Sequence, residues 1–199
     1  MTKFLFDLDG TITKQETLPL IAARFGVGQG IDRLTRETVA GNLPFAESFV
    51  RRVRILGKLP VDEVAGLLTE VDVYPEIEEF IRKNRDDCCI VTGNLSCWIE
   101  GLVQRIGCAY HASEAVVEDN RVARISSVLC KEDIVRKMRD DGHRVVFIGD
   151  GNNDVEAMRI ADVAIASALT HRPADGVLAV ADYLARDAAE LCGRLNRLL

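Results

Sequence analysis

The sequence has little positive charge for its length. Its 199 residues include 25 Lys and Arg against 31 Asp and Glu, a formal net charge of −6 at pH 7. Nucleic acids and anionic membranes bind proteins through basic surfaces, so neither is expected as the main partner. No apolar run reaches the roughly 20 residues that a membrane-spanning helix needs, and no secretory signal pattern is visible. We therefore expect a cytoplasmic protein that binds neither nucleic acid nor membrane.

Other common signatures are missing as well. The six cysteines follow no zinc-binding spacing, and we expect reduced, mostly buried thiols. Two of them, Cys88 and Cys89, are adjacent in an expected strand, where successive side chains point to opposite faces. The sequence has no internal repeat and no low-complexity segment. With 48% hydrophobic residues, it is expected to form one ordinary domain or a domain with a modest insertion.

Short apolar runs alternate with helical patterns along most of the chain. The apolar runs are continuous rather than alternating, which is typical of strands buried on both faces, and they lie at 4–7, 89–92, 145–148 and 163–166. Helical patterns lie at 75–84, 95–107, 131–140 and 154–160. This alternation predicts a Rossmann-like α/β fold, an open parallel sheet flanked by helices. An apolar–turn–apolar stretch at 115–125 predicts an additional β-hairpin.

One interval interrupts this alternation. From Thr13 to about Tyr74 no strand is expected, and a structureless loop of roughly 60 residues is implausible in a compact domain. Apolar residues recur there at helical spacing, with Gly and Pro breaks at 26–28, 41–44 and 57–60. We predict a small inserted helical cap at 14–74, above an α/β core built from 1–13 and 75–199. Its hinges are expected near Thr13 and near Tyr74-Pro75.

Polar residues gather at the expected strand ends, where an open parallel sheet binds its ligands. They are Asp7, Asp9, Thr11, Thr92, Gly93, Asn94, Asp150 and Asp154, with Lys131 at the start of a helix. Clustered carboxylates repel one another and would repel a phosphate. A hard cation such as Mg²⁺ removes this repulsion by binding oxygen atoms of the carboxylates and of the phosphate. Lys131 would offset phosphate charge, and Thr92 with the following helix-start amides would donate to phosphate oxygens. The pattern therefore favours a site for Mg²⁺ and phosphate.

These residues resemble the four motifs of the haloacid dehalogenase-like superfamily of phosphatases, in order. Asp7-Leu8-Asp9-Gly10-Thr11 is similar to motif one, Thr92 to motif two, Lys131 to motif three, and Gly-Asp-Gly-Asn-Asn-Asp at 149–154 to motif four. The resemblance implies that Asp7 is the nucleophile that forms an aspartyl-phosphate, and that Asp9 is the general acid and then the general base. It also implies a catalytic role for Lys131. The implied Mg²⁺ ligands are Asp7, the backbone carbonyl of Asp9, Asp150 and Asp154. The implied substrate-binding residues of the core are Thr92, Gly93, Lys131 and Asn153, of which Thr92 and Lys131 hold the phosphate.

The predicted cap resembles that of phosphoserine phosphatases. Glu16 stands where that family binds the substrate ammonium, Arg52 where it binds the substrate carboxylate, and Phe45 matches a pocket aromatic. The resemblance implies L-phosphoserine or a close amino-acid analogue as the substrate, since arginine binds carboxylates in bidentate fashion. Simpler interpretations remain open: Glu16 as a residue that stabilises a helix N-terminus, and Arg52 as part of a solvated basic face. Asn94 stands where that family commonly has a second glycine.

Other functions remain open as alternatives. The substrate could be another small phosphate ester, such as phosphoethanolamine or a phospho-sugar, and an alcohol could replace water as acceptor. A non-catalytic regulator that binds phosphate metabolites is expected to have lost Asp7, Asp9 or Lys131, and none is lost. No chemistry is assigned to the three histidines, which match no motif: His111, His143 and His171. The expected partner is a small phosphate ester, and the expected assembly is a monomer or a homodimer.

Overall fold

The computed structural model describes residues 1–39 and 42–199. The strands are β1 (Thr2–Phe6), β2 (Cys88–Leu95), β3 (Ala109–Glu118), β4 (Arg121–Ser127), β5 (Arg144–Gly149), β6 (Val163–Ser167) and β7 (Tyr183–Ala185). The helices are α1 (Thr17–Arg24), α2 (Gly28–Val39), α3 (Phe45–Leu56), α4 (Val61–Thr69), α5 (Pro75–Lys83), α6 (Ser96–Ile106), α7 (Lys131–Asp140), α8 (Val155–Ile160), α9 (Asp175–Val180) and α10 (Ala188–Leu195), with a 3₁₀ turn η1 at Asn152–Asp154.

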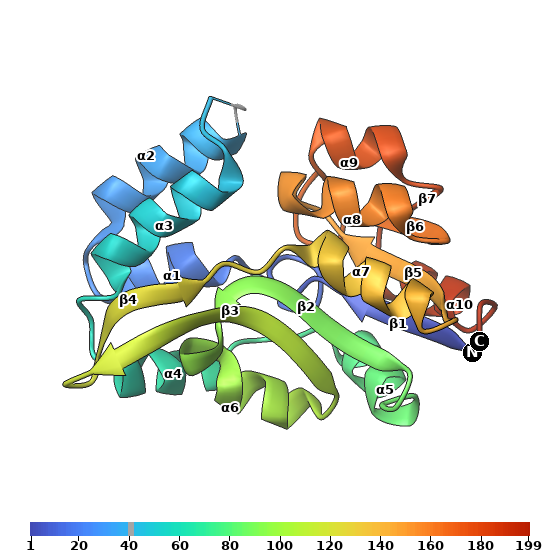
Figure 1. Cartoon of the computed structure of the whole chain (residues 1–199), viewed down its shortest axis with the longest axis horizontal. Coiled ribbons are helices and arrows are strands. Elements are labelled where there is room, and N and C mark those ends of the chain that lie inside the picture. Colours follow the sequence, from blue (N-terminus) through green and yellow to red (C-terminus); the bar gives the residue numbers. More distant parts are fainter. Residues whose placement is uncertain (40–41) are drawn as a thin grey trace.

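The strands form one sheet in the order β4-β3-β2-β1-β5-β6-β7 (Figure 1). Neighbours are parallel throughout, except for the antiparallel pair β3 and β4. Strand β1 lies in the middle, with Phe4 opposite Cys88 of β2 on one side and opposite Val146 of β5 on the other. Strands β2–β4 lie on one side of β1 and β5–β7 on the other, and this reversal of strand order between β1 and β5 creates the crevice where such sheets bind ligands. The predicted Rossmann-like α/β fold is confirmed.

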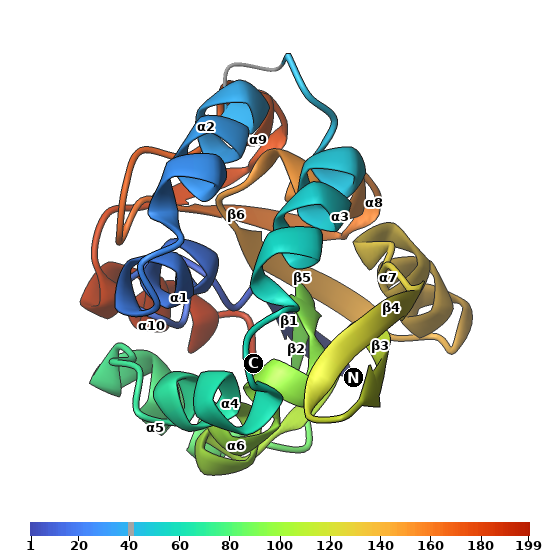
Figure 2. The same cartoon turned by 90° about the vertical axis from the view of Figure 1, so that its left-hand side faces the viewer.

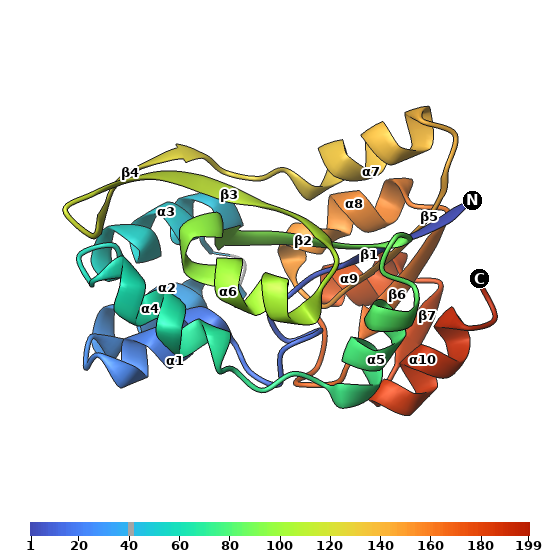
Figure 3. The same ribbon diagram turned by 90° about the horizontal axis from the view of Figure 1, so that it is seen from below.

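Helices cover both faces of the sheet, as its continuous apolar strands require (Figure 3). Side chains of α7, α8 and α9 pack with Leu5 of β1 on one face. Side chains of α5, α6 and α10 pack with Phe4 and Phe6 on the other, in a cluster that continues into α1–α4. Cys88 and Cys89 belong to different clusters, so the adjacent thiols do point to opposite faces, and both are buried.

The interval between β1 and α5 is helical, as predicted. Helices α2 and α3 lie side by side (Figure 2), while α4 lies against α6, where a side chain on Gly101 would overlap Thr69. The segments that enter and leave this interval lie side by side, since Thr13 forms an antiparallel β-bridge with Val73. The break predicted at 41–44 begins at Gly41, outside the described residues. The exact division into core and cap, and the hinges, stay predictions.

Local sequence explains several element boundaries. Helix α5 begins with Pro75 at its first turn, where the missing N–H costs nothing, and α6 ends at Gly107, which adopts φ +85°. The predicted hairpin exists but is longer, because β3 first pairs in parallel with β2. Its turn holds Asp119 and Asn120 at φ 49° and 60°, as a two-residue hairpin turn requires.

The C-terminal elements β7, α9 and α10 were not predicted from the sequence. Strand β7 has only three residues, which are too few to reveal a period. Within the described ranges, no helix combines the length and apolar character needed to cross a bilayer.

Candidate active site

The carboxyl ends of β1 and β5 bring three buried aspartates together. Asp7 follows β1, Asp150 follows β5, and Asp154 ends the 3₁₀ turn that follows; carboxylate oxygens of the three lie within 4.8 Å of one another. Lys131 opens α7 and reaches between them, with its Nζ 2.6 Å from Asp7 Oδ1 and 2.6 Å from Asp154 Oδ1. The side chain of Lys131 is 2% exposed, so this cation is almost fully desolvated.

Asp154 holds this arrangement in place. Its Oδ1 accepts a hydrogen bond from Lys131, and its Oδ2 accepts from the backbone N–H groups of Asp150 and Gly151 at 3.0 and 2.9 Å. The carboxyl group lies directly over Gly149, where a side chain would overlap it. The glycines on both sides of Asp150 therefore let the backbone wrap closely around the Asp154 carboxylate.

The negative charge of the cluster exceeds what Lys131 neutralises. Burial raises the pKa of Asp7 well above its ordinary value, Asp154 and Asp150 raise it further, and only Lys131 opposes them. Burial alone would lower the pKa of Lys131, but the carboxylates raise it, so the ammonium stays charged. Three buried carboxylates with one ammonium are an oxygen-rich, anionic donor set that fits a hard divalent cation.

Asp9 lies at the same edge but in different surroundings. Its Oδ1 accepts hydrogen bonds from the backbone N–H of Thr17, at 2.9 Å, and from the Thr17 hydroxyl. Burial raises the pKa of Asp9 to about 6, and Glu16 contributes in the same direction, while the Thr17 hydrogen bonds oppose the shift. A carboxyl group that titrates close to neutral pH is suited to give up and take back a proton.

Helix α3 contributes a buried arginine near the site. Arg52 of α3 is 7% exposed, whereas its neighbours Arg51 and Arg54 are exposed, so Arg52 is not part of a solvated basic face. Its guanidinium lies 5.8 Å from the centre of the Phe45 ring, and its buried Nε has no hydrogen-bond partner within the described residues. Phe45 in turn lies against Gly93, where a Cβ would be 3.0 Å from the ring.

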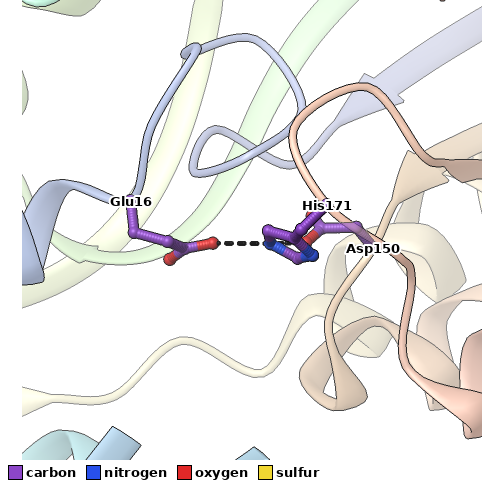
Figure 4. A group of neighbouring side chains, drawn as sticks. All are labelled: Glu16, Asp150 and His171. Atoms are coloured by element: carbon purple, nitrogen blue, oxygen red, sulfur yellow. Dashed lines mark hydrogen bonds and ion pairs between the residues drawn. The ribbon is translucent and has the colours of Figure 1, made fainter. Parts of the chain in front are cut away.

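Glu16, which precedes α1, and Asp150, which follows β5, both contact His171. Nε2 of His171 lies 3.0 Å from Glu16 Oε1 and 3.1 Å from Asp150 Oδ2 (Figure 4). Hydrogen bonds to Asp150 and Glu16 raise the pKa of His171 to about 11, so the imidazole is charged at neutral pH. Glu16 precedes α1 but makes no side-chain capping hydrogen bond, so its carboxylate is directed to His171 and not to the helix N-terminus.

The remaining predicted residues line the same edge. Thr92 in β2 is 1% exposed, and its hydroxyl accepts the backbone N–H of Asn94 at 3.1 Å. Asn153 lies half-buried in the 3₁₀ turn, one residue before Asp154. The structure thus brings predicted residues of β1, β2, β5, α7 and the helical segment between β1 and α5 to one end of the sheet.

Comparison with known proteins places this site in a family. The model of a family described as haloacid dehalogenase-like hydrolase matches residues 2–162. The chain belongs to the haloacid dehalogenase-like hydrolases. The matched segment includes Asp7, Asp9, Thr92, Lys131 and Asp150, the residues that carried the resemblance in the sequence.

Relatives of this hydrolase include phosphoserine phosphatases. The chain is 28% identical to that of Methanocaldococcus jannaschii over 175 residues, which are 81% of this chain and 83% of the relative. It is also 28% identical to that of Archaeoglobus fulgidus, but spans only 51% of that longer protein. A solved structure of a phosphoserine phosphatase with bound substrate is 26% identical, with a TM-score of 0.82 and coverage of 98% of both chains.

His171 was missed in the sequence of this hydrolase. It lies in the loop after β6 and matches no motif, and it contacts Glu16 from 155 positions away. No spacing rule links residues so far apart. The one available signal was that the loop follows β6, whose carboxyl end lies at the same edge of the parallel sheet as those of β1 and β5.

Proposed function

We propose that the protein is a Mg²⁺-dependent phosphomonoester hydrolase that acts through an aspartyl-phosphate on Asp7, with L-phosphoserine or a close amino-acid analogue as substrate. The observation that carries the proposal is that the two oxygens of the Asp7 carboxylate differ in their hydrogen bonding. Its Oδ1 is fixed by Lys131 and by the backbone N–H of Leu8 at 2.8 Å. Its Oδ2 makes no hydrogen bond within the described part of the chain, which leaves one oxygen to attack phosphorus.

The two half-reactions divide between Asp7 and Asp9. In the first, an oxygen of Asp7 bonds to phosphorus, the bond to the substrate alcohol breaks, and Asp9 gives its proton to the departing oxygen. In the second, Asp9 takes a proton from a water molecule that attacks the phosphorus and frees Asp7. A pKa of about 6 lets Asp9 serve in both directions near neutral pH. In both half-reactions, Lys131 and the Thr92 hydroxyl would bind the phosphate oxygens.

A Mg²⁺ ion would be held by Asp7, Asp150 and the carbonyl of Asp9, with Asp154 behind them. When bound, the ion neutralises carboxylate and phosphate charge. Asp154 also supports the site, because it binds Lys131 and the backbone N–H groups of Asp150 and Gly151.

The substrate assignment rests on the two charged residues from the cap side. The buried Nε of Arg52 has no hydrogen-bond acceptor among the described residues. A substrate carboxylate would supply one, in the bidentate geometry that a guanidinium group favours. Glu16 offers its second oxygen to the ammonium group, since its Oε1 is bound to His171.

Metal dependence is the first test of the chemistry. Phosphate release from L-phosphoserine is expected with Mg²⁺ and is expected to fall to background when EDTA removes the metal, and to return when Mg²⁺ is added back. A malachite-green phosphate assay measures it. Unchanged release in EDTA would contradict the Mg²⁺ proposal, whereas release from other esters with phosphoserine ignored would contradict only the substrate.

Removing the Arg52 charge tests the carboxylate site. In Arg52→Met, KM for phosphoserine is expected to rise by about 30-fold or more, because a buried charge loses its partner. Phosphoethanolamine has no carboxylate, so its KM should change little. Arg51→Met is the matched control: Arg51 is exposed and pairs with Glu47 on the surface, so this substitution should leave KM for both esters unchanged. An equal rise for both esters in Arg52→Met would overturn the assignment.

Another small phosphate ester remains the second candidate, and His171 is the observation that favours it. The charged imidazole of His171 lies against Glu16 and offsets its negative charge, which weakens the attraction of Glu16 for a substrate ammonium. 3-Phosphoglycerate has the carboxylate of phosphoserine and a hydroxyl in place of its ammonium. A higher kcat/KM for 3-phosphoglycerate than for phosphoserine would favour this candidate, and the reverse would favour the amino-acid substrate.

A further inference from the structure

Asn94 occupies a buried position that the proposed mechanism does not use. It lies in β2, two residues after Thr92, and is 3% exposed. A buried amide must find partners for both its oxygen and its nitrogen, because an unsatisfied polar group costs stability. The partners of Asn94 therefore indicate what this side chain does at the edge of the active site.

The hydrogen bonds fix the orientation of this amide. Its Oδ1 accepts the backbone N–H of Leu95 at 2.8 Å, so its Nδ2 is the group that faces the cap. Nδ2 donates to the hydroxyl oxygen of Thr17 at 2.7 Å. A backbone N–H can only donate and an amide nitrogen can only donate, so neither end of this arrangement is reversible.

The direction of the next bond follows. Because the Thr17 hydroxyl accepts from Asn94, its own hydrogen is available to donate, and the neighbouring acceptor is Asp9 Oδ1. The backbone N–H of Thr17 donates to the same oxygen. Asp9 Oδ1 therefore receives two hydrogen bonds, and an oxygen so occupied is a poor place for a proton. Oδ2 makes no hydrogen bond among the described residues.

We propose that Asn94 is a positioning residue for Asp9: through the Thr17 hydroxyl it holds Asp9 Oδ1 as an acceptor and so assigns the transferable proton to Oδ2. This inference rests on the proposed function. In the first half-reaction the Asp7–phosphorus bond forms, the bond between phosphorus and the alcohol oxygen breaks, and the proton on Asp9 Oδ2 moves to that oxygen. Asn94 touches neither substrate nor phosphate in this role.

The test separates proton donation from all other effects by the choice of ester. An alkyl alcohol needs a proton as it leaves, whereas p-nitrophenolate leaves without one. The value of kcat/KM reports steps only up to phosphoryl transfer to Asp7, so the later water step does not enter. The two substrates are an alkyl ester (L-phosphoserine, or phosphoethanolamine if the enzyme prefers it) and p-nitrophenyl phosphate, both with Mg²⁺.

For Asn94→Ala, the ratio of kcat/KM for the alkyl ester to that for the aryl ester is expected to fall by about fivefold, the value of one lost hydrogen bond. Thr17→Val has the same shape as threonine but no hydroxyl, and should lower the ratio at least as much. Thr17→Ser restores the hydroxyl and should restore the ratio. The kcat of the alkyl ester should fall while its KM changes little.

Other outcomes overturn the inference in distinguishable ways. An equal fall of kcat/KM for both esters would mean that Asn94 only supports the fold, and a rise in KM alone would mean that it contacts the substrate. If Thr17→Ser did not restore the ratio of kcat/KM values, the Thr17 hydroxyl would not be the link between Asn94 and Asp9. A wild-type enzyme inactive on every ester, or an Asp7→Asn variant as active as wild type, would overturn the proposed function itself and this inference with it.

Discussion

Asp7→Asn is expected to abolish phosphate release, by roughly three to six orders of magnitude in kcat, as the loss of a covalent nucleophile does in other hydrolases. The amide can still accept the N–H of Leu8 through its oxygen, but it cannot bond to phosphorus. Rapid acid quenching of the reaction with phosphate-labelled substrate should trap a phosphoenzyme in the wild type and none in the variant.

Asp9→Asn is the matched control for this experiment. It leaves Asp7 and Lys131 in place, so the variant should still become labelled by p-nitrophenyl phosphate, whose leaving group needs no proton. Label in Asp7→Asn, or none in Asp9→Asn, would show that the phosphoryl group is carried elsewhere.

The fold of Asp7→Asn should survive, which separates lost chemistry from lost structure. Burial and repulsion from Asp154 both make the Asp7 carboxylate unfavourable in the folded state, and Lys131 keeps Asp154 as a partner when the charge is removed. In metal-free buffer the melting temperature of the variant should therefore equal or exceed that of the wild type. A large decrease would mean that Lys131 needs both carboxylates.

The sheet could be predicted from the sequence because its strands carry continuous apolar runs that are short and separated by amphipathic helices. The range predicted for α7 agrees with the structure at both ends, since Lys131–Asp140 has a polar flank and a single apolar stripe. Strand β7 could not be predicted in the same way. It has three residues, and Tyr183 is exposed, so its place is set by pairing with β6 and not by its own pattern.

The active-site edge was predictable for a similar reason. Parallel strands end at one edge, so Asp7 and Asp150 had to lie near each other once β1 and β5 were recognised as strands. Pairings between loops follow no such rule. Asn94 meets Thr17 across 77 positions, and the sequence showed only that a glycine was replaced. Which way the amide would point depends on the N–H of Leu95, a detail of the backbone.

Lys131→Met is expected to have the largest effect on stability. The change keeps the length of the side chain but leaves Asp7 and Asp154 buried without the cation that pairs with both of them. Breaking a buried ion pair by removing one partner costs about 3–5 kcal/mol, and this loss should appear in the free energy of unfolding of the metal-free protein near pH 8. Chemical denaturation followed by circular dichroism measures it. Lys137→Met is the matched control on the same helix, because Lys137 pairs with Asp141 at the surface and should contribute less than about 1 kcal/mol.

The dependence of this loss on pH identifies its cause. Burial already raises the pKa of Asp7 in the folded protein, followed by repulsion from Asp154, and without Lys131 the pKa rises further. A carboxyl group that binds its proton more tightly when folded makes stability fall as pH rises from the unfolded pKa, about 3.9, towards the folded one. The difference in free energy of unfolding between wild type and Lys131→Met should therefore widen as pH rises and shrink as pH falls.

A second substitution, Asp154→Asn, tests the same cause. It should recover part of the lost stability in the Lys131→Met background, because there it removes a repelling charge. In the wild type it should be destabilising, because there it removes an ion-pair partner of Lys131. A loss that is the same at every pH, with no such coupling, would mean that Lys131 stabilises the fold by packing and not by its charge.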